Sequence, residues 1–113
     1  DEVLPAEKLG EYQYLVPKRR YSAFVNTDIM TLLNSFKADT LILTGAATNV
    51  CVHYTGADAH QYDFKIKVVV EATAGTSKES HEAALNALNY LQHGAKVPIE
   101  LVLEAMKDFK FPH

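Results

Sequence analysis

The feature that most constrains the fold is an alternation of short apolar runs with helix-like patterns, which continues from about residue 14 to residue 108. The runs at 41–44 and 66–70 are apolar on both sides of a strand, as in parallel sheets that helices cover. Strands that alternate with helices form a parallel sheet through right-handed crossovers. We therefore expect one domain over residues 1–113, with a three-layer α/β/α, Rossmann-like architecture. The expected strands are 14–16, 41–44, 66–70 and 95–97; the expected helices are 27–36, 48–61, 77–93 and 98–108; residues 1–12 are expected to form a lead-in loop.

Capping residues and periodicity predict where the helices begin and end. The first helix has one apolar face, formed at helical spacing by Ile29, Leu32, Leu33 and Phe36. Thr27 can cap its start. Thr76 and Glu79 form a capping-box pattern before the third helix, and Gly94 suits the position just beyond its end.

Composition excludes several classes of protein. The net charge of −3 gives no basic surface for a nucleic acid. No apolar run is long enough to span a bilayer, and the first residues are acidic rather than the basic start of a signal peptide. The single cysteine cannot form an internal disulfide, which fits a reducing cytoplasm.

That cysteine, Cys51, follows the apolar run at 41–44 and lies at the start of the second expected helix. Ligands of open parallel sheets bind outside the carboxyl ends of the strands, where Lys18, Cys51 and Glu71 could face one another. A helix start and a nearby ammonium favour the thiolate, which is the nucleophilic form of cysteine. The alternative is a small buried core residue, which is the commoner role of a lone cysteine.

Two stretches carry a resemblance to a known family: VPKRRYSAF at 16–24 and LILTGAATNVCVHYTGADA at 41–59. With Thr27, they resemble the isochorismatase-like cysteine hydrolases. This family includes nicotinamidases, N-carbamoylsarcosine amidases, ureidoacrylate-type amidases and isochorismatases. The matching stretch spans about residues 14–72, so the chain resembles the C-terminal portion of the family fold.

The resemblance implies a role for individual residues. Cys51 matches the nucleophile, and Lys18 matches the catalytic lysine that stabilises the thiolate. The Ala46–Ala47 peptide bond matches one that is cis in this family, and the N–H groups of Ala47 and Cys51 match its oxyanion hole. Two aromatic residues match positions that border the substrate pocket: Tyr21 and Phe24.

The chain also departs from the family. The third catalytic residue of the family is an aspartate at the end of an apolar N-terminal strand, and neither precedes Asp1 here. We expect a companion segment to supply that strand and acid, with Glu71 as the alternative acid. No metal site is expected from this chain: His53 and His60 are a weak pair, and a zinc ion would need ligands from the companion segment. Homo-oligomers are common in the family and are expected here.

The resemblance implies hydrolysis of a C–N amide bond in a small molecule, of the N-carbamoyl amide or nicotinamide type, through an acyl-enzyme. No other cofactor is required from this chain. Two alternatives stay open. One is an isochorismatase, whose vinyl-ether cleavage needs no thiol; the other is an inactive family member that serves as a binding or scaffold subunit. Arg19 and Arg20 could act as a carboxylate or phosphate clamp, or simply be solvated.

Overall fold

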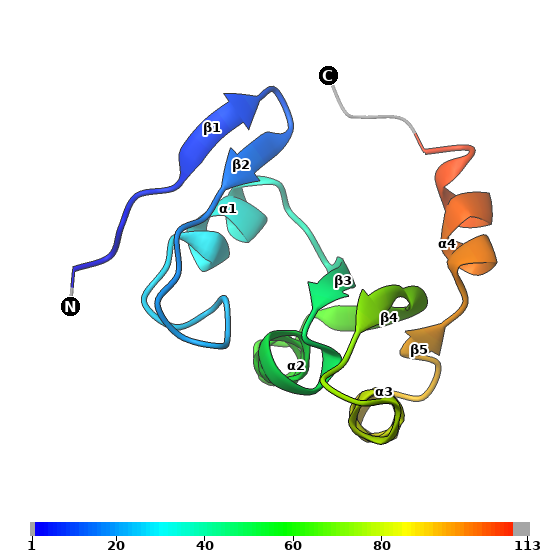
Figure 1. The fold of residues 1–113 in the computed structure, drawn as a ribbon. Coiled ribbons are helices and arrows are strands. Elements are labelled where there is room, and N and C mark those ends of the chain that lie inside the picture. Colours follow the sequence, from blue (N-terminus) through cyan, green and yellow to red (C-terminus); the bar gives the residue numbers. More distant parts are fainter. Residues whose placement is uncertain (1, 110–113) are drawn as a thin grey trace.

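The computed structural model describes residues 2–109, and its centre is a three-stranded parallel sheet in the order β3-β4-β5 (Figure 1). The strands are β3 Thr40–Ala46, β4 Lys65–Ala74 and β5 Lys96–Val97. The middle strand, β4, pairs in parallel with β3 on one side and with β5 on the other. The parallel sheet expected from the runs at 41–44, 66–70 and 95–97 is thereby confirmed.

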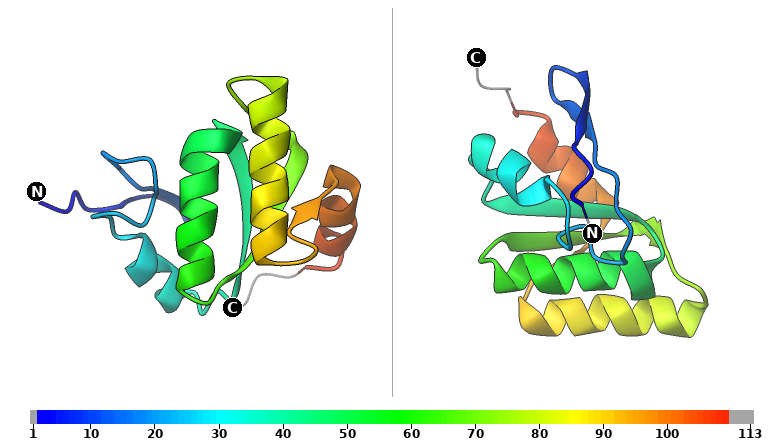
Figure 2. Two further views of the ribbon diagram at one scale, coloured as in Figure 1. Left: turned by 90° about the horizontal axis from the view of Figure 1, so that it is seen from below. Right: turned by 90° about the vertical axis from the view of Figure 1, so that its left-hand side faces the viewer.

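Helices cover both faces of this sheet. The helical segments of the described chain are α1 Ile29–Ser35, η1 Thr48–Val52, α2 His53–Gln61, α3 Lys78–Leu91 and α4 Ile99–Met106, of which α2, α3 and α4 lie against the sheet. Helices α2 and α3 lie side by side on one face, and α4 lies on the other (Figures 1 and 2). The result is the expected three-layer arrangement. Within residues 2–109, no helix has the length and apolar character needed to cross a membrane.

The core lies between the sheet and the two helices α2 and α3. Its buried residues come from both layers: Val52, Ala59, Phe64, Ile66, Val68, Leu85, Leu88 and Ala95. Helix α2 approaches closely because position 56 is glycine: a Cβ there would lie 3.0 Å from a methyl of Leu88 and 3.2 Å from a methyl of Leu43. The small residue therefore sets the distance between the layers.

The side chain of Gln92, just after α3, makes hydrogen bonds that connect α3 with α2 and with the start of β4. Its Nε2 lies 2.9 Å from the Phe64 carbonyl oxygen, to which it donates, and 2.8 Å from His60 Nδ1. Its Oε1 accepts a hydrogen bond of 3.0 Å from the Ile66 N–H. The end of α3 is thus tied to α2 and to the start of β4, and His60 takes part in this link through Nδ1.

The N-terminal region differs from the sequence prediction. Residues 7–15 form a hairpin in which β1 Glu7–Gly10 pairs antiparallel with β2 Gln13–Leu15, in a sheet of its own. The lead-in loop predicted for residues 1–12 and the parallel strand predicted at 14–16 were therefore wrong. Only Glu11 and Tyr12 separate the two strands, and so short a connection makes local antiparallel pairing the accessible arrangement.

Two helix starts also differ in detail. Helix α3 is capped by Ser77, whose Oγ accepts a 3.0 Å hydrogen bond from the Ser80 N–H, so the predicted capping box of Thr76 and Glu79 was wrong. Helix α1 begins at Ile29, one residue later than a cap at Thr27 predicts; Thr27 still contributes, because its Oγ1 accepts a 3.2 Å hydrogen bond from the Ile29 N–H.

The core makes a direct prediction about stability. Leu88→Ala should lower the free energy of unfolding by about 2–5 kcal/mol, because Leu88 is fully buried at 0% exposure and the truncation leaves a cavity. Leu91→Ala, on the same helix but 40% exposed, is the matched control and should cost far less. Urea titration of both variants measures the difference; equal losses would contradict the assignment of the core.

Candidate active site

The candidate site is built on the turn that joins β3 to η1. Gly45 ends the regular part of β3 with a φ of +102°, a conformation that favours glycine. The next peptide bond, Ala46–Ala47, is cis, as the resemblance implies. Across the sheet, β4 bulges at the same level: Leu43 pairs with Val68, but Gly45 pairs with Thr73. The turn therefore leaves the sheet at the carboxyl end of β3.

Cys51 lies in a π-helical segment and not in the first turn of an α-helix. The Ala47 carbonyl accepts hydrogen bonds from the N–H groups of Val50, at 3.0 Å, and of Val52, at 3.2 Å. The bond from Val52 spans five residues, which is the π-helical pattern. The helix predicted over 48–61 has those bounds, with the difference that its first part, Thr48–Val52, is π-helical. Such π segments are frequent at functional sites.

Lys18 reaches the thiol from a segment far away in the sequence. Its Nζ lies 3.5 Å from Cys51 Sγ, and it donates to the carbonyl oxygens of Arg20, at 2.9 Å, and Tyr21, at 3.2 Å. An ammonium group has three N–H donors, so these three acceptors use all of them. The half-buried thiol thus has a fixed positive charge beside it.

The loop that carries Lys18 is itself anchored to α2. Thr55 Oγ1 accepts a 2.9 Å hydrogen bond from the Ala23 N–H, and Thr27 donates its hydroxyl to the Ala23 carbonyl. Ser22 is buried at 5% exposure, and its Oγ accepts from the Phe24 N–H at 3.2 Å. These bonds explain why a loop without regular structure can hold Lys18 in place.

Glu71 does not join Lys18 and Cys51. Its Oε1 accepts a 3.0 Å hydrogen bond from the Ile99 N–H at the start of α4. A carboxylate at a helix start satisfies a backbone donor that has no partner within the helix. The expectation that Glu71 could face the thiol was therefore wrong, and Glu71 has a structural contact that explains its presence.

The two aromatic residues of the expected substrate pocket lie in different surroundings. Tyr21 is 61% exposed and stacks on Tyr54 of α2, with ring centroids 5.7 Å apart. Phe24 packs between Tyr62 and Phe64, with centroid distances of 5.4 and 6.1 Å, beside the core. A role at the pocket stays a prediction for both.

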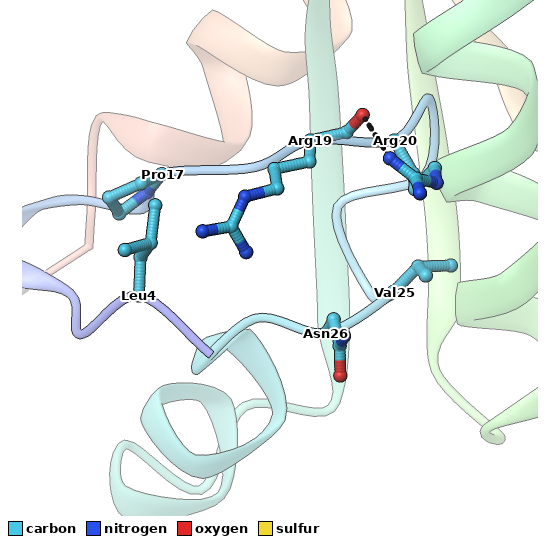
Figure 3. Close-up of a pocket in the computed structure, with 6 residues that line it drawn as sticks. All are labelled: Leu4, Pro17, Arg19, Arg20, Val25 and Asn26. Carbon is cyan, nitrogen blue, oxygen red and sulfur yellow. Dashed lines mark hydrogen bonds between the residues drawn. The ribbon is translucent and has the colours of Figure 1, made fainter. Parts of the chain in front are cut away.

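A cavity of about 170 Å³ lies beside the Lys18 loop (Figure 3). It is lined by Leu4, Pro17, Arg19, Arg20, Val25 and Asn26. Arg19 donates to the Glu2 carbonyl at 2.6 Å, and Arg20 donates to the Arg19 carbonyl at 3.2 Å. Because Cys51 is not among the lining residues, this cavity does not enclose the thiol.

Sequence reasoning missed the partners of two polar residues in the turn between β3 and η1: His81, which contacts Thr48, and Thr76, which contacts Asn49. The available signal was Thr48 itself, a polar residue between an apolar strand and the cysteine. Over residues 2–109, no group of three or more His, Cys, Asp or Glu side chains is arranged to hold a metal ion.

Comparison with known proteins identifies the family. The model of the isochorismatase domain matches residues 1–98. The chain belongs to the isochorismatase family. It is 35% identical over 88 residues to the uncharacterized isochorismatase family protein PncA of Bacillus subtilis, a match that covers 75% of this chain and 48% of the relative. It is 38% identical over 86 residues to the ureidoacrylate amidohydrolase RutB of Methylorubrum extorquens, covering 76% and 31% of the two chains.

Solved structures agree. An isochorismatase-like hydrolase from Alkaliphilus metalliredigens superposes with a TM-score of 0.80 at 34% identity, covering 88% of this chain and 55% of the other. The nicotinamidase PncA from Bacillus subtilis gives a TM-score of 0.69 at 36% identity, covering 74% and 45%. The chain spans about half the length of three curated relatives that it matches, between 48% and 56% of each.

The contact between Lys18 and the thiol makes a prediction that needs no substrate. Lys18→Ala should slow alkylation of Cys51 by iodoacetamide at pH 7 by about tenfold, because an ordinary free thiol is only a few per cent ionised at that pH. Arg19→Ala is the matched control: it removes a neighbouring charge whose guanidinium donates to the Glu2 carbonyl and not to Cys51, and it should change the rate little. Equal slowing in both variants would show a general field effect of the basic loop instead of a direct contact.

Proposed function

We propose that this isochorismatase-family chain hydrolyses the C–N amide bond of a small molecule, with Cys51 as nucleophile. The observation that carries the proposal is the Lys18 ammonium 3.5 Å from Cys51 Sγ, at the carboxyl end of a parallel sheet. Similarity to a ureidoacrylate amidohydrolase and to nicotinamidases supports amide substrates of the N-carbamoyl or nicotinamide type.

The chemistry follows from the turn. The Cys51 thiolate, stabilised by Lys18, attacks the amide carbonyl carbon, and the N–H groups of Ala47 and Cys51 hold the developing oxyanion. The C–N bond breaks, the nitrogen takes a proton, and ammonia or an amine leaves. Water then attacks the thioester, which releases a carboxylic acid and restores the thiol.

The described residues place no acid beside Lys18 and Cys51, because Glu71 is bound to the start of α4. We infer that a companion segment supplies the acid. Parallel strands end at the same edge of a sheet, so an acid at the end of a strand next to β3 would reach the nucleophile turn. Activity of the assembled protein is therefore proposed, and not activity of residues 1–113 alone.

The edge of β3 offers the place for that segment. In the part of the chain that the structure describes, β3 pairs with β4 on one side only, and its Ile42 is 48% exposed. Beside it lies an apolar groove of about 250 Å³, lined by Thr40, Ile42, Lys67, Val97, Leu101, Val102 and Ala105. No residue of α4 is buried, although the helix is largely apolar. An unpaired edge next to exposed apolar side chains fits a further strand with its own helix.

Two further expectations are proposals of the same kind. The assembled protein is proposed to form a homo-oligomer. Since residues 2–109 hold no cluster of metal-binding side chains, the described residues do not fit a zinc site, and no step of the mechanism uses a metal.

The thiol mechanism is tested with the full protein and its Cys51→Ala variant. Nicotinamide, N-carbamoyl amino acids and isochorismate are offered to both, and ammonia or product release is measured. We expect amide turnover that falls by at least about a thousandfold in the variant, since the nucleophile is lost. Amide turnover that survives in Cys51→Ala would refute the mechanism. Turnover of isochorismate alone, unaffected by the substitution, would instead support an isochorismatase.

The companion segment is tested by fusion. Residues of Bacillus subtilis PncA that this chain does not match are fused before Asp1, and amide turnover of the fusion is compared with that of residues 1–113. We expect turnover in the fusion and none in the shorter chain. Ile42→Asp in the fusion should reduce turnover, because it places a charge on the apolar groove. Equal turnover by residues 1–113 alone would contradict the need for a companion.

A further inference from the structure

We propose that His81 and Thr76 are positioning residues for the nucleophile turn, residues 45–51. Their hydrogen bonds to Thr48 and Asn49, which we call the two grips, fix the spacing of the two N–H groups of the oxyanion hole. The inference rests on the proposed thiol chemistry and adds Thr76 of the β4–α3 connection and His81 of α3 to its machinery. Neither residue touches the thiol in the contacts described above, so both act through the turn.

The first grip joins Thr48 to His81. Thr48 is completely buried, at 0% exposure, and its Oγ1 lies 2.7 Å from His81 Nδ1. A buried hydroxyl without a partner is costly, so the imidazole satisfies a group that would otherwise disfavour this turn. The hydroxyl can donate to Nδ1 of one neutral tautomer or accept from the other, and either arrangement holds Thr48 against α3.

The second grip joins Asn49 to Thr76 by two hydrogen bonds. The Asn49 Nδ2 donates to Thr76 Oγ1 at 2.9 Å, and the Thr76 N–H donates to Asn49 Oδ1 at 3.0 Å. Two bonds between one side chain and one residue fix its orientation as well as its distance. The turn is therefore held at two successive residues, Thr48 by a residue 33 positions further along the chain and Asn49 by one 27 positions further.

Close packing around Gly75 restricts the positions of the two hydrogen-bonded pairs, Thr48–His81 and Asn49–Thr76. A Cβ at Gly75 would lie 2.7 Å from the Cβ of His81 and 3.1 Å from the Asn49 Oδ1. The first distance is shorter than a van der Waals contact, so only glycine lets the connection approach both grips. Any larger residue at position 75 would push His81 and Asn49 apart.

The position of the grips in the sequence gives them their function. Thr48 and Asn49 lie between Ala47 and Cys51, whose N–H groups form the proposed oxyanion hole. A displacement at either grip moves one donor relative to the other. The Lys18 ammonium reaches Cys51 from a separate loop, so we expect its contact with the thiol to depend less on the two grips than the spacing of the oxyanion donors does.

That difference defines the experiment. Iodoacetamide alkylates a thiolate without forming an oxyanion, whereas a small aldehyde such as butyraldehyde forms a thiohemiacetal whose oxygen occupies the oxyanion position. In that step the Sγ–C bond forms, the C=O double bond becomes a single bond, and the thiol proton passes to the carbonyl oxygen. Both reactions are measured on the full protein and on two variants at position 81, His81→Ala and His81→Asn, whose amide Oδ1 can accept or Nδ2 can donate in place of Nδ1. Glu82→Ala is an exposed control on the same helix.

We expect His81→Ala to weaken aldehyde binding by about tenfold, less than the loss of a whole oxyanion donor, and to change the alkylation rate by less than about twofold. His81→Asn should recover most of the affinity, and Glu82→Ala should resemble the parent. Thr76→Val against Thr76→Ser gives a second pair that removes or keeps the hydroxyl. The valine variant should weaken aldehyde binding, and the serine variant should not.

Other outcomes overturn the proposal. Unchanged aldehyde binding in His81→Ala and Thr76→Val, in a parent that binds the aldehyde, would refute the positioning role and leave the proposed function intact. Parallel losses of alkylation and aldehyde binding would show that the residues merely keep the fold together. A parent whose Cys51 neither alkylates nor binds aldehyde would refute the thiol chemistry, and the positioning role with it.

Discussion

The parallel pairing of β3 with β4 is the constraint on which the rest of the structure depends. It brings the carboxyl ends of both strands to one edge, so the turn that bears Cys51 and the connection that leads through Thr76 to His81 of α3 begin side by side. The bulge in β4 is part of this arrangement. Thr73 is buried there, and its Oγ1 donates toward the carbonyl oxygens of Val69, at 2.9 Å, and Val70, at 3.3 Å. The hydroxyl thus compensates backbone groups that the bulge removes from the ladder.

The sheet and its helices could be predicted because each strand or helix has its own pattern of apolar residues within a short stretch of the sequence. The run from Ile66 to Val70 is an apolar pattern typical of a buried strand, and the structure places Ile66 and Val68 in the core. The hairpin could not be predicted in the same way. Its strands are three and four residues long, mostly exposed, and joined by two residues. Without an alternation of buried and exposed residues, a single sequence carries little evidence of pairing.

The candidate site was predictable only in part, because contacts between residues far apart in the sequence leave no local pattern. Cys51 and Lys18 stand in stretches that resemble a known family, and the structure brings their side chains together. The partners of the turn were not predictable. Thr48 and His81 lie 33 positions apart, and nothing in the residues around His81 distinguishes it from an exposed histidine on a polar helix face. The π-helical turn was missed because a single inserted residue per turn leaves the pattern of apolar positions almost unchanged.

The geometry around Lys18 explains why this position requires a lysine. Its ammonium group directs three donors to three acceptors that lie around it: two carbonyl oxygens of its own loop and the sulfur of Cys51. A guanidinium presents its donors in a plane. An arginine that donated to two of these acceptors would therefore not donate to the third. The two carbonyl contacts also fix the loop, and the loop in turn is fixed to α2 through Thr55. Position 18 therefore combines two tasks, a charge beside the thiol and the closure of the loop that delivers it.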